Sequence, residues 1–474
     1  MFITILEIVL SNEIWTFEQI LLLYKASKSV YLVTVTTSPL LEVSFNRDNF
    51  HPKVFSKLQN LSNINFLKFE DCISVDCLEQ LLELISRHCN TLNHLDLSDN
   101  WINANYTKRL AGVLCTCTSL IHLNLSCNVI RSEGATEIAE VLSILTSLKH
   151  LDLRSNKIKE KGAESIAKVL LQCPSIKHLD LSDNNIKTEG ADSLIGALTN
   201  LESLDLSDNW FEDQGNKLIG NLHQCTNLTR LSMAGNNIDI EGVKRFGRAL
   251  PHLTTLASLN ISGNRFDIEG TTILTGVLSF CTTLTRLDFS SNYMDEVGSA
   301  SFAQVLTHCR ALVHLNLGRN LIRSIGATSL AGALGECNNL ALTHLDLSDN
   351  EIEADGLASL APALVRPQCS SLVHLNLSCN SLGSNGAESL ASVLPQCLSL
   401  VFLDLCNTRI GPNGAASLAG VLPQCMALVH LDLCNNGIGS AMIDTIRSVQ
   451  EQCSSLKSLD LSYNEEIEEI EATD

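Results

Sequence analysis

Residues 148–174 read LKHLDLRSNKIKEKGAESIAKVLLQCP, and this stretch decides the fold. Leu-Asp-Leu at 151–153 alternates as a short strand does when one of its faces is buried. Asn156 follows at a bend, where an amide side chain can pair with backbone groups that the bend leaves without partners. Residues 162–170 then place apolar side chains at helical spacing. The stretch therefore predicts one unit made of a strand, a turn and a helix.

The frame of this unit, leucine-x-x-leucine-x-leucine-x-x-asparagine, returns about 15 times at a spacing of about 28 residues. A weaker copy spans Ile64 to Cys72, and the asparagine position of the later copies is held by Asn100, Asn128, Asn156, Asn184, Asn209, Asn236, Asn264, Asn292, Asn320, Asn350, Asn380, Thr408, Asn436 and Asn464. A fixed period of this size predicts a solenoid, which grows by stacking similar units. The repeated asparagines are expected to form a buried ladder of amides.

Alternating strands and helices predict a parallel sheet on one side of the solenoid and helices on the other. Neighbouring strands lie about 4.8 Å apart, whereas helices need about 10 Å. The stack should therefore curve into a horseshoe with its strands on the concave face. We expect an N-terminal cap with a possible degenerate repeat over residues 1–63, the repeat domain over 64–464, and an acidic tail over 465–474.

The helical segments read GAESIAKVL at 162–170, GATSLAGAL at 326–334 and GAASLAGVL at 414–422. Together with the leucine and asparagine frame, they resemble the ribonuclease-inhibitor-like leucine-rich repeats over roughly residues 64 to 464. The resemblance implies an α/β solenoid that binds other proteins. Its class includes inhibitors, sensor regions of immune receptors, a GTPase-activating family and bacterial effectors, so the class leaves the particular role open.

The chain carries 52 acidic and 32 basic residues, a formal net charge of −20. Such a charge disfavours nucleic acid and anionic membranes, which need a basic face. It favours a protein partner with a basic surface. No apolar stretch of the length that spans a bilayer is present. No P-loop, GxSxG, HExxH or paired CxxC motif occurs either, so we expect a monomeric, non-enzymatic binding protein with no cofactor and no metal.

Ten of the 18 cysteines recur eleven residues before a repeat asparagine, which makes them equivalent positions in different units: Cys89, Cys117, Cys173, Cys225, Cys281, Cys309, Cys369, Cys397, Cys425 and Cys453. Stacking would place most such sulfurs too far apart to bridge. The prediction is free thiols, and hence a reducing compartment such as the cytoplasm. Cys406 and Cys434 occupy outward strand positions near His374 and His430, where a Cys/His dyad could be drawn. An open wall gives such a dyad no water-excluded pocket.

Two rows of side chains should face outward on the strands. Six residues before the asparagine stand His94, His122, His150, His178, His314, His344, His374 and His430; four before it stand mostly aspartates and asparagines. Three interpretations remain open. The rows can solvate the scaffold, bind a metal through imidazole and carboxylate, or form a pH-sensitive interface, because imidazole ordinarily titrates near neutral pH.

Interruptions of these rows suggest where a partner binds. Arginine replaces histidine at Arg230 and Arg286, and aromatic residues follow the asparagine at Trp101, Trp210 and Tyr293. Arginine, tryptophan and tyrosine dominate interface hot spots, and in related inhibitors the aromatic residues of the rim face the ligand. We therefore predict that these five residues contact the partner. The alternative is that the tryptophans only cover apolar surface.

The chain ends in a glutamate-rich segment with Glu465, Glu466, Glu468, Glu469 and Glu471. A polar cap or a frayed tail explains it simply. It also resembles the C-terminal signals of effectors that intracellular bacteria deliver by type IV secretion, which implies a protein secreted into the host cytoplasm to bind a host protein. A GTPase-activating or other enzyme-regulating protein, and the sensor region of an immune receptor, are the alternatives that the resemblance leaves open.

Overall fold

The computed structural model describes residues 41–48, 50–58, 61, 64–211, 217–336, 342–366 and 369–464. The contacts divide the chain into two compact units, Met1–Leu228 and Thr229–Asp474. Residues 1–40 and the acidic tail, 465–474, lie outside the described residues, so the cap, the tail and the two boundaries between the three predicted domains remain predictions.

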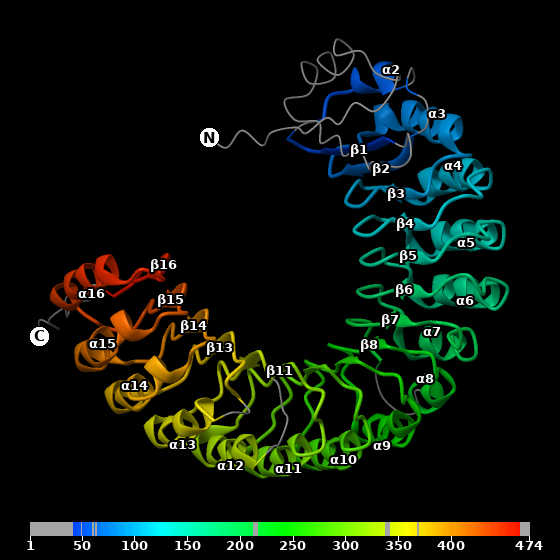
Figure 1. The fold of residues 1–474 in the computed structure, drawn as a ribbon. Helices are drawn as coiled ribbons and strands as arrows, with labels where there is room; N and C mark the ends of the chain where they lie inside the picture. The colour runs from blue at the N-terminus through cyan, green and yellow to red at the C-terminus, as the bar shows by residue number, and fades with distance from the viewer. Residues whose placement is uncertain are drawn as a thin grey trace, which may run out of the picture. The chain divides into compact units, whose positions relative to one another are not determined.

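The first unit contains β1 (Leu41–Asn46), α2 (Val54–Leu58), β2 (Ile64–Glu70), η1 (Val75–Cys77), α3 (Leu78–His88), β3 (His94–Asp96), α4 (Ala104–Leu114), β4 (His122–Asn124), α5 (Arg131–Leu142), β5 (His150–Asp152), α6 (Lys159–Leu170), β6 (His178–Asp180), α7 (Lys187–Ser193), β7 (Ser203–Asp205), α8 (Lys217–Asn221) and η2 (Leu222–Gln224). Its strands pair in parallel, each with the next along the chain. The helices lie along the other side of this row of strands (Figure 1).

The second unit contains β8 (Arg230–Ser232), α9 (Ile240–Ala249), η3 (Leu250–His252), β9 (Ser258–Asn260), α10 (Ile268–Leu278), β10 (Arg286–Asp288), α11 (Glu296–Leu306), β11 (His314–Asn316), α12 (Arg323–Glu336), β12 (His344–Asp346), α13 (Ala354–Leu364), β13 (His374–Asn376), α14 (Gly383–Ala391), η5 (Leu394–Gln396), β14 (Phe402–Asp404), α15 (Gly411–Ala419), η6 (Leu422–Gln424), β15 (His430–Asp432), α16 (Ser440–Gln452) and β16 (Ser458–Asp460). These strands are also parallel and in register. The predicted α/β leucine-rich repeat solenoid is confirmed.

The buried asparagine ladder is present as predicted. The side-chain amide of Asn184 donates to two carbonyl oxygens. One is that of Leu153 in the preceding repeat, at 2.9 Å, and the other is that of Leu181 in its own repeat, at 3.0 Å. Its Oδ1 accepts the backbone N–H of Asn156 at 2.9 Å. Asn156 and Asn184 are both fully buried. Because ladder asparagines such as Asn184 pair with the repeat before them, the ladder satisfies backbone groups at these bends and ties successive repeats together.

The repeat from Asn184 to Asn209 is three residues shorter than the common 28, and its helix is correspondingly short. Helix α7 spans seven residues, whereas α6 in the preceding repeat spans 12. The residues missing from this repeat are therefore accompanied by a shorter helix.

Candidate functional site

A groove about 360 Å³ in volume runs across the strands of the first unit from β3 to β7. The two outward rows of side chains line it, including His94, His122, His150 and His178 in one row and Asp152, Asp180 and Asp205 in the other. The leucine between each pair of outward residues is buried in the core, as at Leu151. Strand alternation therefore sets the groove lining, and the parallel register aligns equivalent side chains from neighbouring repeats.

The histidines of the first unit form a continuous stack. The ring centroids are 4.8 Å apart between His94 and His122, 3.9 Å between His122 and His150, and 4.0 Å between His150 and His178. Phe66 extends the stack, with its ring centroid 4.3 Å from that of His94. Phe66 stands six residues before Cys72, so the repeat register could have identified it. Its identity as phenylalanine sets it apart from the histidines that define the rest of the row.

The near-neutral titration that is ordinary for imidazole does not hold for His94 and His150 in this stack. Burial, and then the neighbouring His122, lower the pKa of His94 to about 4. Burial, with His122 and His178 as neighbours, also lowers the pKa of His150 to about 4. A protonated ring in the stack would lose solvent and face another cation, and both effects favour the neutral form. His94, His122 and His150 therefore present uncharged imidazoles at neutral pH.

The acidic row has both a structural and an electrostatic role. The Asp152 and Asp180 carboxylates each accept, through Oδ1, the backbone N–H two residues later, at 2.9 Å. These bonds orient the side chains at the ends of the strands. Burial raises the pKa of Asp152 to about 6, and the negative charge of Asp180 adds to this rise. Carboxylates aligned on neighbouring strands repel one another, so this groove favours a cationic ligand group.

Trp101 and Trp210 follow the first and the last of the strands that line the groove, but neither side chain lines it. Each follows a buried ladder asparagine, with a backbone φ of 56° at Trp101 and 59° at Trp210. Their exposed fractions are 74% and 52%. Strands β3 and β7 have three strands between them and stand roughly 19 Å apart along the row, at about 4.8 Å per strand step.

The other three predicted residues lie in the second unit. Arg230 on β8 and Arg286 on β10 are both exposed, and Ser258 on β9 pairs with each of them in register. Arg286 lines a second groove of about 330 Å³ together with His314 and His344. Tyr293 follows the asparagine of the same repeat as Arg286 and is 55% exposed.

In that second groove, burial, then the adjacent histidine, and then the Arg286 guanidinium lower the pKa of His314 and of His344. The rings of His314 and His344 are 4.1 Å apart between centroids. His374 and Phe402 stack with centroids 4.2 Å apart, so a phenylalanine enters this row as well. Histidine stacks therefore occur in both units, and Arg286 supplies a permanent positive charge next to the second one.

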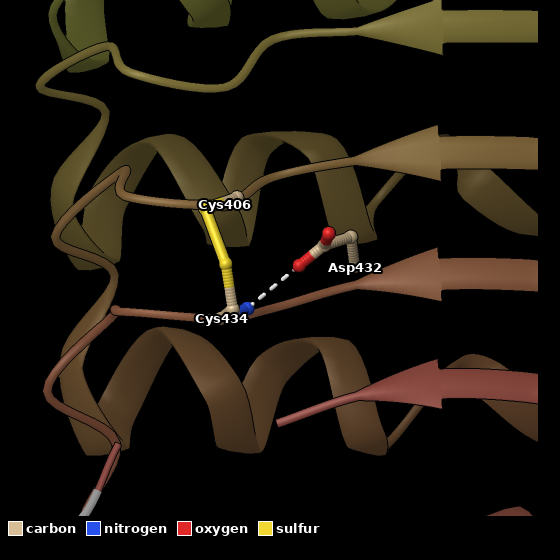
Figure 2. A group of neighbouring side chains, drawn as sticks. All are labelled: Cys406, Asp432 and Cys434. Carbon is tan, nitrogen blue, oxygen red and sulfur yellow. Dashed lines mark hydrogen bonds between the residues drawn. A yellow bond between two sulfur atoms is a disulfide. The ribbon is translucent and has the colours of Figure 1, made fainter. Parts of the chain in front are cut away.

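Cys406 and Cys434 are joined to each other by a disulfide (Figure 2). The expectation of free thiols is wrong for this pair, and the Cys/His dyad is excluded in this state because both sulfurs are bonded. The reason is register: the two cysteines occupy the same position in adjacent repeats, with their Cα atoms 4.6 Å apart. The ten cysteines at the helix ends are free, as expected.

Comparisons with known proteins agree with this architecture. A family model described as Leucine Rich repeat matches residues 88–105, 116–139, 145–167, 172–194, 197–220, 224–247, 338–361, 368–391 and 452–468. No curated protein matches the chain in sequence. On the repeat frame, the parallel strands and these matches, the chain has the leucine-rich repeat solenoid fold.

Two solved structures are similar to it. One is an internalin, InlF, from Listeria monocytogenes, at 21% identity and a TM-score of 0.49, covering 87% of this chain and 94% of that chain. The other is TLR13 in a complex with the single-stranded RNA ssRNA13, at 18% identity and a TM-score of 0.46, covering 90% of this chain and 66% of that chain. Likenesses at this level carry no argument about function.

Proposed function

We propose that this protein is a non-enzymatic module that binds another protein through the groove of its first unit and the exposed tryptophans that follow the first and last strands of that groove. The observation that carries the proposal is that Trp101 and Trp210, both largely exposed, follow the first and the last of the five strands that line this groove. Exposed tryptophans are costly in water and are among the strongest interface anchors. In the leucine-rich repeat class, the strand face commonly serves this purpose.

The groove favours a partner segment rich in lysine or arginine. Its carboxylates include Asp152, Asp180 and Asp205, and the turns beside it add exposed Asp183 and Asp208. The histidines in the same groove do not offset this charge, because the pKa of His94 and of His150 lies at about 4. The overall charge of −20 acts in the same direction. A basic protein surface would be steered here, whereas nucleic acid would be repelled.

The test compares the Trp101→Ala/Trp210→Ala double variant with the wild-type chain. Proteins captured from host cytosol by both are identified by mass spectrometry, and the candidate partner is then purified for affinity measurement. Loss of both anchors should weaken binding by about 2 kcal/mol or more, roughly 30-fold in Kd. Phe280→Ala and Leu398→Ala are matched controls, because these side chains are 65% and 78% exposed but lie outside the groove. An equal loss in the controls, or no loss in the double variant, would reject the site.

We propose a further contact with the same partner on the second unit. It consists of Arg230, Arg286 and Tyr293, which would bind acidic or polar groups of that partner. All three are exposed. The affinity for the purified partner is measured for Arg230→Ala alone and combined with Trp210→Ala. The comparison shows whether Arg230 and Trp210 contact the same partner. If the affinity falls only when the tryptophans are replaced, the binding site is restricted to the first unit.

The finer role, an effector secreted by bacteria into the host cytoplasm, is proposed on the sequence of the glutamate-rich end alone. Glu465 to Glu471 lie outside the described residues. Deletion of residues 465–474 and measurement of delivery into host cells test this role. Delivery at the wild-type level would reject the signal and leave the binding proposal untouched.

A further inference from the structure

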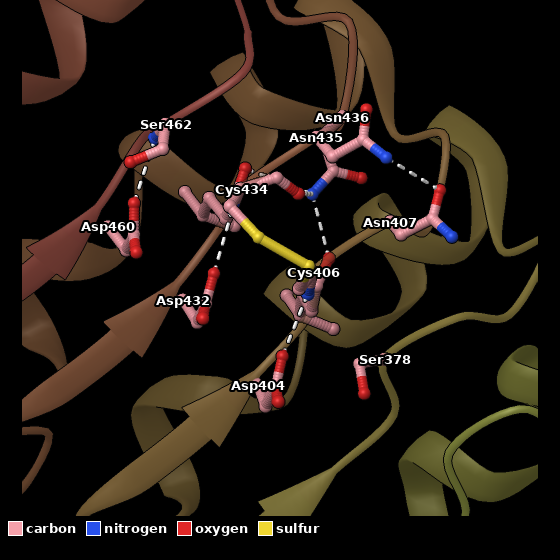
Figure 3. Close-up of a disulfide and its surroundings, with 12 residues drawn as sticks. Ser378, Asp404, Cys406, Asn407, Asp432, Cys434, Asn435, Asn436, Asp460 and Ser462 are labelled. Carbon is pink, nitrogen blue, oxygen red and sulfur yellow. Dashed lines mark hydrogen bonds between the residues drawn. A yellow bond between two sulfur atoms is a disulfide. The ribbon is translucent and has the colours of Figure 1, made fainter.

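The disulfide lies at a repeat position that normally holds serine. Two residues before the ladder asparagine, Ser378 and Ser462 occupy this place in the flanking repeats, and Ser378 donates its hydroxyl to Asn376 at 2.7 Å. Cysteine replaces serine only at Cys406 and Cys434, in two adjacent repeats. A single replacement of serine by cysteine at this position would change the scaffold little. Two in register bring a pair of sulfurs together on the strand face (Figure 3).

A carboxylate lies beside this pair. A ligand oxygen of Asp432 and the two sulfurs all lie within 4.8 Å of one another, and among the described residues this is the one such group of three potential metal ligands. The backbone N–H of Cys434 donates to Asp432 Oδ1 at 2.8 Å, which fixes the carboxylate toward the sulfurs (Figure 2). All three residues are half-buried, so solvent and ions can reach them.

The chemistry of these donors suits a borderline or soft divalent cation. Thiolates prefer zinc-like ions to calcium or magnesium, and carboxylate is an accepted third ligand. Zinc–sulfur bonds of about 2.3 Å place two sulfurs roughly 3.8 Å apart in a tetrahedral site. The Cα separation of 4.6 Å permits this with side-chain rotation alone. A water molecule would complete four-coordination.

We propose that the reduced form of this protein binds one zinc-class divalent cation through Cys406, Cys434 and Asp432, and that the disulfide closes the site. A dithiol reductant supplies two electrons and two protons, becomes a disulfide itself, and leaves a thiol on each cysteine. Binding of the cation then releases the two thiol protons to solvent, forming two metal–sulfur bonds. Two thiolates and one carboxylate place three negative charges around a dipositive ion. The site is independent of the proposed partner groove.

Cobalt(II) is the probe, because thiolate-to-cobalt charge transfer reports sulfur ligation directly. The full-length protein is reduced, freed of reductant without air, and titrated with cobalt, after which zinc is added in competition. We expect one cobalt per chain with a charge-transfer band that zinc removes. The oxidised protein should show no band, and re-reduction should restore it.

Variants assign the ligands. Loss even of outer-shell partners costs about 10–100-fold in metal affinity, so Cys406→Ser and Cys434→Ser should each cost roughly 100-fold or more. Serine is the usual residue here, so both variants should fold. Asp432→Asn should weaken binding while keeping the sulfur band. Cys379→Ser, an exposed cysteine one repeat earlier, is the control and should bind as the wild type does. A band that survives in both serine variants, or cobalt binding by the oxidised protein, would overturn the proposal.

Discussion

The backbone N–H of Asn156 donates to the side-chain Oδ1 of Asn184, one repeat later, at 2.9 Å. This bond crosses from one repeat to the next, and the Asn184 amide returns the connection by donating to Leu153 of the earlier repeat. Each asparagine therefore serves two repeats, and the cost of losing one should exceed that of an ordinary buried hydrogen bond.

Replacement of Asn184 by alanine should lower the free energy of unfolding by about 3 kcal/mol, because it leaves several buried backbone groups without partners. Thr408→Asn should do the opposite. Thr408 donates to Leu405 and Asn436 through its hydroxyl, but it is too short to reach the preceding repeat as an asparagine does. We expect a gain of about 1 kcal/mol in urea denaturation. If Asn184→Ala left the free energy of unfolding unchanged, the ladder would be dispensable for stability.

Two glycines make a matched pair for packing. A Cβ on Gly162 would lie 2.4 Å from Ile158 Cγ2 and 3.0 Å from the Cβ of Ala135 in the previous repeat, whereas one on Gly112 meets nothing within 4 Å. Gly162→Ala should therefore cost about 1–3 kcal/mol of stability through overpacking. Gly112→Ala, inside helix α4, should gain about 0.5–1 kcal/mol from helix propensity. Thermal unfolding of the two variants checks both the predicted loss and the predicted gain of stability. Equal shifts in Tm for the two variants would contradict the packing argument.

Stability should depend on pH through the histidine stack. The pKa of His150 is about 4 in the folded chain and 6.5 for an unperturbed imidazole, so the unfolded chain binds more protons between these values. The stability contributed by this residue is complete above pH 6.5 and is lost as the pH falls toward 4. Asp152 acts in the opposite direction, because its pKa is raised from 3.8 to about 6 and the folded chain takes up the extra proton.

His150→Phe should therefore reduce the fall in Tm between neutral pH and about pH 4.5, while Asp152→Asn should enlarge it. Phenylalanine suits the stack, since Phe66 already occupies the same position in the row. The measurement is Tm against pH for the wild type and both variants. Parallel curves for all three would show that these groups do not govern acid stability.

The disulfide should stabilise the second unit under oxidising conditions. It closes a loop of 28 residues, for which loop entropy predicts about 3–4 kcal/mol. The Cys406→Ser/Cys434→Ser double variant should lose this amount in urea denaturation without reductant. With reductant and a chelator, the wild type and the variant should coincide. A difference that persists under reduction would point to packing rather than to the cross-link.

Much of the fold could be predicted from the sequence because the repeat frame is local. Each leucine and asparagine meets the same neighbours in every unit, so the period alone places Leu151 in the core and Asn156 in the ladder. The outward rows followed from the same register. The proposed binding residues are harder to predict, because exposed positions such as Trp101 and Trp210 are not required by the scaffold.

The sequence by itself determined the repeat, the alternation of strand and helix, and the faces on which the side chains lie, because these depend on spacing along the chain. Only the tertiary structure decided how outward side chains from different repeats act on one another. Stacking and burial lowered the pKa of His94 and His150, and register joined Cys406 to Cys434. Both results depend on distances of a few ångströms between residues far apart in the sequence, which a period does not specify.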